Sequence, residues 1–302
     1  MPPARTARPR RRPVADETLL RARLDDLVAT FDISTITPDP LELVLRYDAP
    51  RDREVAGLLA AAFAYGRAEI VVANVGRVLD AMAPSPAGWL LDLQRESGFD
   101  RARARRTFRG FAHRFHKTAD LVALLERIAL ALARHGSLGA LFRIHYRDDE
   151  PDVGPSLARF VAALIEIDGA PPAPPSLRYL LSSPDDGSAC KRMNLFLRWM
   201  VRREPPDLGL WTFVDPAKLV VPLDTHVHRI ARFLGLTERK AADWKTARQV
   251  TDRLARFHAA DPVRYDFAIC RLGILDRCSR ARRKENCDVC LLREVCRFPV
   301  VG

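Results

Sequence analysis

The stretch from Val221 to Leu236 constrains the fold of this chain most, because it combines one apolar helix face with an acidic residue at its start. Apolar residues recur at helical spacing, which predicts a helix from about Thr225 to Leu234. Gly235 follows as a usual helix stop. Asp224 falls at the N-cap, where its carboxylate can accept first-turn amide hydrogens at the positive end of the helix dipole. The sequence therefore predicts a rigidly held, ionised carboxylate. The apolar positions are Val227, Ile230, Ala231 and Leu234.

Two other interpretations apply to this segment. In the first, Asp224 is a helix cap and nothing more, and the segment alone leaves that interpretation open. In the second, Asp-Thr-His-Val-His is a strand with three ligand types on one face, which resembles the metal-binding strand of amidohydrolase barrels. A barrel needs many more alternating strands and helices than can follow here. On a helix, His226 and His228 point to different faces, so we reject the metal strand.

The rest of the chain also reads as helix, with no strand pattern of convincing length and no internal repeat, so the predicted fold class is all-α. Asp52 is predicted to cap one helix, and Asp261 another that has Pro262 in its first position. The helical patterns cover residues 16–31, 41–45, 52–64, 70–82, 118–135, 137–146, 153–167, 177–181, 190–202, 241–257 and 263–273.

The most basic segment runs from Arg101 to Lys117. Phe108, Phe111, Ala112 and Phe115 form an apolar stripe in it at helical spacing, which leaves the arginines on the opposite face. Such a face is either solvated without a partner or a surface that contacts phosphates.

The charge balance bears on partners. The chain has 302 residues, with 49 Lys and Arg against 38 Asp and Glu, a net charge of +11. This excess indicates a polyanionic partner, although a GC-rich genome also produces Arg-rich proteins. Residues 1–13 hold five arginines and no acid and are predicted to be a disordered basic tail. No apolar run is long enough for a membrane span or a signal peptide, so we expect a cytoplasmic protein without a membrane partner.

Four of the six cysteines are crowded near the C-terminus, with the spacing Cys278-x8-Cys287-x2-Cys290-x5-Cys296. In a chain without an export signal, such crowding indicates a metal or cluster site rather than disulfides. Zinc modules usually offer two close pairs of ligands, and only Cys287 and Cys290 form such a pair. The uneven spacing favours a 4Fe-4S cluster, whose corners are farther apart, and zinc is the alternative.

Basic residues lie between the first two of these cysteines, so a bound cluster would brace a basic surface; they are Arg280, Arg282, Arg283 and Lys284. Cys190 and Cys270 lie in predicted helices and are expected to be core thiols.

Three features occur in order along the chain: a turn and helix start at 187–194 that contains Lys191, the Leu-Asp-Thr-His-Val helix start at 223–227, and the terminal cysteine loop. Together they resemble the helix-hairpin-helix (HhH-GPD) base-excision DNA glycosylase superfamily, the endonuclease III and adenine glycosylase group. Within it, the chain looks most like an uncharacterised bacterial family. The resemblance runs from about Ser182 to Cys296. Ala189 stands where the superfamily's hairpin has its second glycine.

The resemblance implies a two-domain helical fold with DNA in the cleft. Residues 50–203 would form a helical barrel that includes the hairpin-like turn, and residues 14–49 with 204–302 would form the cluster domain. Asp224 would be the catalytic aspartate and Lys191 the lysine that bifunctional members use as nucleophile. Cys278, Cys287, Cys290 and Cys296 would be the cluster ligands. The expected DNA-contacting residues are Gly187, Ser188, Arg192, Arg282, Arg283 and Lys284.

The implied activity is cleavage of a base–deoxyribose bond in double-stranded DNA, with or without lyase activity at the abasic site, by a monomer associated with the nucleoid. A fixed carboxylate such as Asp224 would stabilise the oxocarbenium-like sugar. A wedge residue is also needed, and Phe63, Tyr65 and Trp211 are the aromatic candidates. The alternatives are a non-catalytic iron–sulfur protein that recognises DNA structure and a zinc-stabilised helical adaptor.

Overall fold

The computed structural model describes residues 13, 15–275, 277–278 and 283–298. Most of these residues are helical, which confirms the predicted helical class. The helices up to the central one are α1 (Glu17–Thr30), α2 (Leu41–Val44), α3 (Pro50–Ala62), α4 (Ala68–Asp80), α5 (Pro86–Leu93), α6 (Arg101–Thr107), α7 (Thr118–His135), α8 (Leu138–His145), α9 (Gly154–Ile165), α10 (Pro175–Leu180) and α11 (Lys191–Val201). They are followed by α12 (Thr225–Leu234), α13 (Trp244–Ala255), α14 (Asp266–Ile274) and α15 (Lys284–Asp288).

The described strands form two short antiparallel hairpins, which the sequence did not predict. β1 (Gln94–Arg95) pairs with β2 (Gly98–Phe99), and β3 (Ala112–His113) pairs with β4 (His116–Lys117). No helix within the described ranges has the length and apolar character that a membrane crossing needs.

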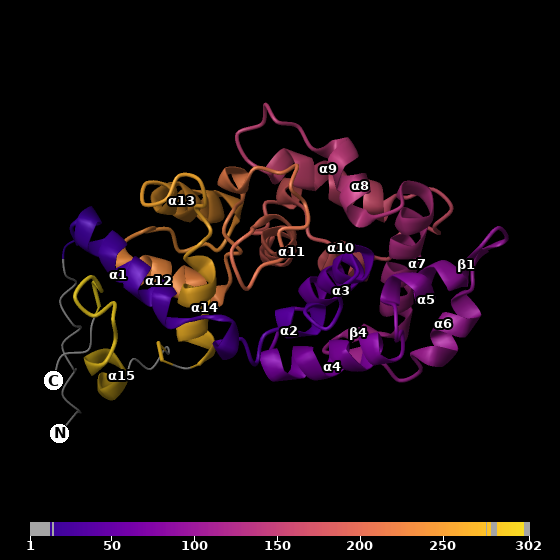
Figure 1. Ribbon diagram of the computed structural model, residues 1–302, viewed down its shortest axis with the longest axis horizontal. Helices are drawn as coiled ribbons and strands as arrows, with labels where there is room; N and C mark the ends of the chain where they lie inside the picture. The colour runs from indigo at the N-terminus through magenta and orange to yellow at the C-terminus, as the bar shows by residue number, and fades with distance from the viewer. Residues whose placement is uncertain (1–12, 14, 276, 279–282, 299–302) are drawn as a thin grey trace, which may run out of the picture.

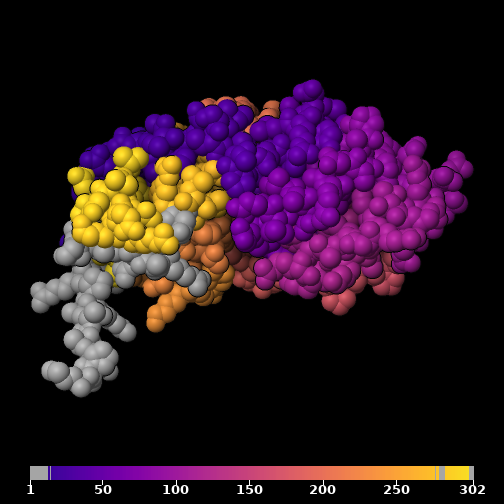
Figure 2. Space-filling view, turned by 90° about the horizontal axis from the view of Figure 1, so that it is seen from below, coloured from indigo at the N-terminus to yellow at the C-terminus, as the bar shows by residue number. Residues whose placement is uncertain are grey.

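The helices are arranged along one axis with α11 near the middle (Figure 1). α1, α12, α13, α14 and α15 occupy one end of the molecule, and α5 to α7 occupy the other. The first helix and the cysteine-containing segment therefore adjoin, as the indigo and yellow surfaces in Figure 2 also show. An ion pair joins them directly, because Arg23 of α1 contacts Glu294 at 2.7 Å.

The centre of the core is the contact between α11 and α3. Gly57 of α3 lies against Phe196 and Met200 of α11, and a methyl group at that glycine would come within 2.8 Å of the Met200 side chain. Every residue of α11 from Arg192 to Val201 is buried. The helix is therefore fixed along its length, and its first residue, Lys191, is held with it.

Most helical predictions are confirmed, above all that for α12. The helix runs from Thr225 to Leu234, Asp224 caps it, Gly235 ends it in the left-handed conformation, and its buried residues are the four predicted apolar positions. α1 buries Leu20, Leu24 and Leu27 as its pattern requires.

Two predicted helix caps are wrong. Asp52 lies inside the first turn of α3, and its carboxylate instead accepts hydrogen bonds from Ser85 Oγ and the Ala87 amide at the start of α5. α14 begins only at Asp266, and Asp261 forms an ion pair with Arg202 at 2.7 Å. In both cases a tertiary partner holds the carboxylate that local spacing assigned to a cap.

The single helix predicted for Arg101 to Lys117 is also wrong. α6 ends at Thr107, and the β3–β4 hairpin follows. Gly110 and Arg114 have φ values of 81° and 55°, which a continuing helix cannot accommodate. Arg101 pairs with the buried Glu126 of α7, so this arginine belongs to the packing of the domain.

Candidate active site

A cavity of about 550 Å³ lies where α2, α11, α12 and α14 meet the start of α4. Both residues predicted to be catalytic, Asp224 and Lys191, line it. Its volume falls within the range of ordinary ligand pockets. Its other polar or charged lining residues are Asp39, Arg67, Glu69, Arg198, His226, Asp266 and Cys270.

Asp224 is held by the N-terminus of α12. One of its oxygens, Oδ1, accepts hydrogen bonds from the amides of His226 at 2.8 Å and Val227 at 2.7 Å. Among the described residues, the second oxygen, Oδ2, accepts just one hydrogen bond, a weak one from the Cys270 thiol at 3.7 Å. The two amides and the helix dipole stabilise negative charge on this carboxylate. Asp224 therefore caps its helix with one oxygen and presents the other to the cavity.

Lys191 is the first residue of α11, so it reaches the cavity from a different helix start than Asp224 does. Its Nζ donates a hydrogen bond to the carbonyl oxygen of Ala64 at 3.0 Å, just beyond the end of α3. The preceding residue, Cys190, has a φ of 48°, in the left-handed region, and this turn sets the direction in which α11 starts. The amine is thus fixed in the wall of the cavity that contains Asp224.

Besides Asp224 and the exposed Glu69, two further carboxyl groups line the cavity, and no sequence pattern indicated either of them. Asp39 accepts a hydrogen bond from the Leu41 amide at 2.9 Å at the start of α2, and Asp266 is the first residue of α14. Burial raises the pKa of both carboxyl groups, and that of Asp266 reaches about 6. At Asp266 the Arg198 charge opposes this rise, while the Asp224 charge adds to it. Only tertiary packing of α2, α12 and α14 brings the three acids together.

Asp266 also belongs to a buried chain of ion pairs. Its Oδ2 accepts a hydrogen bond from Arg198 at 2.5 Å, and Arg198 also pairs with Asp207 at 3.1 Å. Asp207 in turn pairs with Arg202, which pairs with Asp261. This chain connects α11 to α14 and to the loop after α11, so it fixes the two walls of the cavity relative to each other.

Cys270 differs from the core thiol that the sequence predicted. It lies on α14, lines the cavity and donates to Asp224. Its pKa is raised well above the usual range, first by burial and then by the charges of Asp224 and Asp266. Cys270 is therefore a neutral thiol beside a carboxylate. Cys190, by contrast, is fully buried, as expected of a core thiol, and burial raises its pKa to about 12.

Gly187 and Ser188 of the hairpin-like turn are not among the described residues that line the cavity. Gly187 is exposed, has a φ of 70°, and has open space where a Cβ would lie. Ser188 forms an isolated bridge with Asp243, which ties the turn to the start of α13. The bridge therefore holds the turn in place, and Gly187 is exposed to solvent.

Arg192, expected to contact DNA, is only 9% exposed. Its guanidinium lies over the rings of Tyr179 and Tyr65, at 4.3 Å and 5.3 Å from their centroids. It also donates to the Tyr179 carbonyl oxygen. A guanidinium enclosed in this way is a packing element, and we withdraw it from the residues expected to reach a phosphate.

Two of the three candidate wedge residues are also buried. Phe63 is 1% exposed, and Trp211 is 2% exposed with its Nε1 donating to Glu54 at 2.7 Å. Neither side chain can enter a duplex. Tyr65 is half-buried next to Ala64 and Gly66 of the cavity wall, where it stacks on the exposed Phe115.

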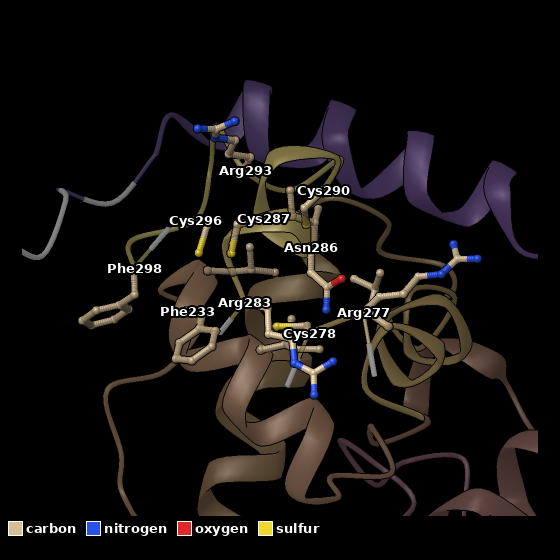
Figure 3. Close-up of a pocket in the computed structure, with 14 residues that line it drawn as sticks. Phe233, Arg277, Cys278, Arg283, Asn286, Cys287, Cys290, Arg293, Cys296 and Phe298 are labelled. Carbon is tan, nitrogen blue, oxygen red and sulfur yellow. The ribbon is translucent and has the colours of Figure 1, made fainter. Parts of the chain in front are cut away.

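The four C-terminal cysteines line a second pocket, and their side chains converge on it in Figure 3. The rest of its wall is largely apolar and includes Ile230, Phe233 and Leu234 of α12. None of the chain's six cysteines, all of which lie in the described residues, forms a disulfide. Among the described residues, no three His, Cys, Asp or Glu side chains are arranged to hold a single metal ion.

Burial raises the pKa of the Cys278 thiol to about 11 and raises that of Cys290 as well. Arg229 of α12 connects this pocket to the cavity, because its Nη2 donates to the Cys278 carbonyl oxygen and contacts His226 Nδ1 at 3.3 Å. The start of α12 therefore faces the cavity, and its later turns form the wall of the cysteine pocket.

The basic residues near the cysteines can be placed only in part. Arg283 is exposed at the start of α15 and also lines the cysteine pocket, while Lys284 is exposed and pairs with Asp288 at 2.7 Å. Arg282 and Arg280 lie outside the described residues, as do residues 1–12 of the predicted tail.

A family model matches residues 39–275. The chain belongs to this family, which is described as "Protein of unknown function (DUF2400)". The match contains every residue that lines the cavity and stops before Cys278. No curated protein and no solved structure matches the chain.

Proposed function

We propose that this protein is a DNA glycosylase that cleaves the bond between a base and deoxyribose in double-stranded DNA. The observation that carries the proposal is the presence of Asp224 and Lys191, from two different helix starts, in the wall of one cavity of about 550 Å³. An acid and an amine in the wall of one pocket are the groups that this reaction uses at the sugar.

Asp224 would stabilise the positive charge that develops on the sugar as the base leaves. A carboxylate stabilises this charge well only if it is already in place before the reaction, because moving it into position would cost free energy. The two amide hydrogen bonds to Oδ1 hold the group rigidly and leave Oδ2 directed at the cavity. Lys191, or a water molecule, would then attack the sugar carbon. Attack by Lys191 would add lyase activity.

The four C-terminal cysteines fit an iron–sulfur cluster. They supply four thiols to a largely apolar pocket. A 4Fe-4S cluster takes four thiolates at wider separation, whereas zinc would need them around one centre. The cluster would be held by Cys278, Cys287, Cys290 and Cys296. When bound, it would join these four residues and pack against α12, which lines the pocket. Ligation would also require the buried thiols to lose their protons.

The role of Asp224 can be tested by a binding experiment that does not require knowing which damaged base the protein recognises. The probe is a duplex in which a cationic pyrrolidine replaces one deoxyribose, and the reference is the same duplex with a neutral tetrahydrofuran. A site built for a cationic sugar binds the first duplex more tightly. We expect Asp224→Asn to abolish this preference, a loss of about 100-fold, while affinity for the neutral duplex is retained. Equal affinity of the wild-type protein for both duplexes would refute the proposal.

Base release and borohydride trapping on duplexes that carry damaged bases or abasic sites measure turnover directly. A covalent adduct that forms with the wild-type chain and not with Lys191→Ala identifies the lysine as nucleophile. Base release without an adduct identifies water instead. Binding without base release from any lesion would favour the alternative of a non-catalytic DNA-structure-binding protein.

A further inference from the structure

Asp266 has a free oxygen in a buried setting. The residue is 2% exposed and lines the same cavity as Asp224 and Lys191. Its Oδ2 is held by Arg198 at 2.5 Å, whereas its Oδ1 is buried and has no hydrogen-bond partner among the described residues. An unpaired carboxylate oxygen in such a place is costly, because burial removes its water without providing a donor. A proton on Oδ1 relieves this cost and turns the oxygen into a donor.

The groups around Asp266 also favour the protonated form. Burial raises its pKa to about 6, and the charge of Asp224 on α12 acts in the same direction. Arg198 of α11 opposes the shift, but its guanidinium is shared with the fully buried Asp207. The other titratable groups that line the cavity are Asp39 of α2, Glu69 and Arg67 near the start of α4, Lys191 of α11, His226 of α12 and Cys270 of α14.

We propose that Asp266 is a second catalytic residue of this cavity, the general acid that protonates the departing base, and that the substrates are therefore bases that carry no charge in the DNA and take up a proton as they leave. This inference rests on the glycosylase function proposed above. Two carboxyl groups with different surroundings divide the work, as in glycoside hydrolysis, where one is an acid and the other stabilises the sugar.

In the proposed step, the bond between C1′ of the sugar and the base nitrogen breaks, and its electron pair goes to the base. The proton on Oδ1 of Asp266 passes to a ring atom of the base, and the remaining carboxylate stays paired with Arg198. Asp224 stabilises the sugar cation until water or the Lys191 amine bonds to C1′. The proton that the attacking water or amine loses restores Asp266.

The substrate class follows from the chemistry of the leaving group. A neutral base leaves as an anion unless it receives a proton, so it depends on a general acid. An alkylated purine such as 7-methylguanine already carries a positive charge and needs no proton to leave. The loss caused by removing the acid is therefore expected to differ between the two kinds of base.

The experiment compares single-turnover base release by the full-length protein with its metal intact, from duplexes that contain one 7-methylguanine or one neutral oxidised or deaminated base. For Asp266→Asn, which keeps an acceptor for Arg198, we expect a loss of at least ~100-fold on the neutral base and less than about threefold on 7-methylguanine. The wild-type rate on the neutral base falls about tenfold per pH unit above pH ~6, and the variant rate does not depend on pH there.

Infrared difference spectroscopy tests the protonation of the Asp266 carboxyl group without an activity measurement. A carboxylic-acid band that titrates near pH 6 in the wild-type protein and is missing in Asp266→Asn supports the inference, and its absence from the wild-type spectrum overturns it. Equal losses on both bases, or an unchanged rate on the neutral base, also overturn the acid role while leaving the glycosylase proposal intact. If the wild-type protein releases no base from any duplex and has no preference for the cationic sugar, the proposed function fails instead.

Discussion

Asp224 and Asp266 line the same cavity, but one is held by its own helix start and the other by a residue distant in the chain. Asp224 is an N-cap with an apolar helix face directly after it, and that pattern is local. Asp266 follows a turn in which the local pattern indicated an earlier helix start, and its importance depends on Arg198, far away in the chain. Asp39 depends in the same way on the packing of α2 against the cavity. Spacing predicts a residue's helix position but not which distant side chains it will meet.

The raised pKa of Asp266 predicts how its contribution to stability changes with pH. The usual value is 3.8 and the value in the folded protein is about 6, so between these values the folded state binds more protons than the unfolded state. The free energy of unfolding therefore falls as the pH rises through this window. From the size of the shift, Asp266 accounts for at most ~3 kcal/mol of this fall. The Asp266→Asn variant has no titratable group at this position, so it loses this part of the fall in the free energy of unfolding.

Urea denaturation of the wild-type protein and Asp266→Asn between pH 4 and pH 7 measures this difference. We expect the variant to gain stability relative to the wild type as the pH rises, on top of a pH-independent cost from the weakened Arg198 pair. Parallel stability curves for the two proteins would show that Asp266 titrates at its usual value in the folded state.

At the scale of elements, long amphipathic helices were predicted well and short turns poorly. α7 and α12 have the predicted bounds, because a continuous apolar face and a clear stop determine them. The β3–β4 hairpin was missed because its strands have two residues each, too few to show alternation. Its aromatic residues happen to recur at helical spacing, and Phe115 is exposed although the helical pattern predicted it to be buried.

The close contact of α12 with α14 fixes the relative positions of Asp224 and Asp266, and Gly273 makes this contact possible. A Cβ at Gly273 would lie 2.3 to 2.5 Å from three atoms of His226. Gly273→Ala therefore has to push the two helices apart, and overpacking of this kind costs ~1–3 kcal/mol. We expect lower thermal stability, and a loss of preference for the cationic-sugar duplex at temperatures where the variant is still folded.

The matched control for this variant is Gly76→Ala. Gly76 is buried in α4, and a Cβ there would meet its nearest atom at 3.6 Å, an ordinary contact distance. Alanine also has the higher helix propensity, so we expect Gly76→Ala to be neutral or stabilising by up to ~1 kcal/mol with binding unchanged. If Gly273→Ala binds both duplexes as the wild type does, the α12–α14 contact does not position the two acids.

At the scale of the whole molecule, the sequence predicted the order of helices and the cysteine loop, but not how the loop is connected to the cavity. That connection passes through α12, which contributes Asp224 to the cavity and Ile230, Phe233 and Leu234 to the cysteine pocket. Arg23 of α1 also pairs with Glu294, between the third and fourth cysteines. These contacts join residues that are far apart in the sequence, so no local sequence pattern predicts them.

We expect the effect of losing the proposed cluster to depend on distance from this end of the molecule. A group bound by the four cysteines stabilises the folded state alone, so Cys287→Ser should lose the metal and cost on the order of 4 kcal/mol. Hydrogen exchange should show lost protection in α1, α12 and α14, and unchanged protection in α5 to α9, which do not contact the pocket. Weaker binding of the cationic-sugar duplex should accompany this loss, because Asp224 depends on α12. Cys190→Ser is the control, since that thiol is buried outside the cysteine pocket and its substitution should not change binding of the proposed cluster. If metal loss left protection of α12 unchanged, the cysteine pocket would not brace the cavity.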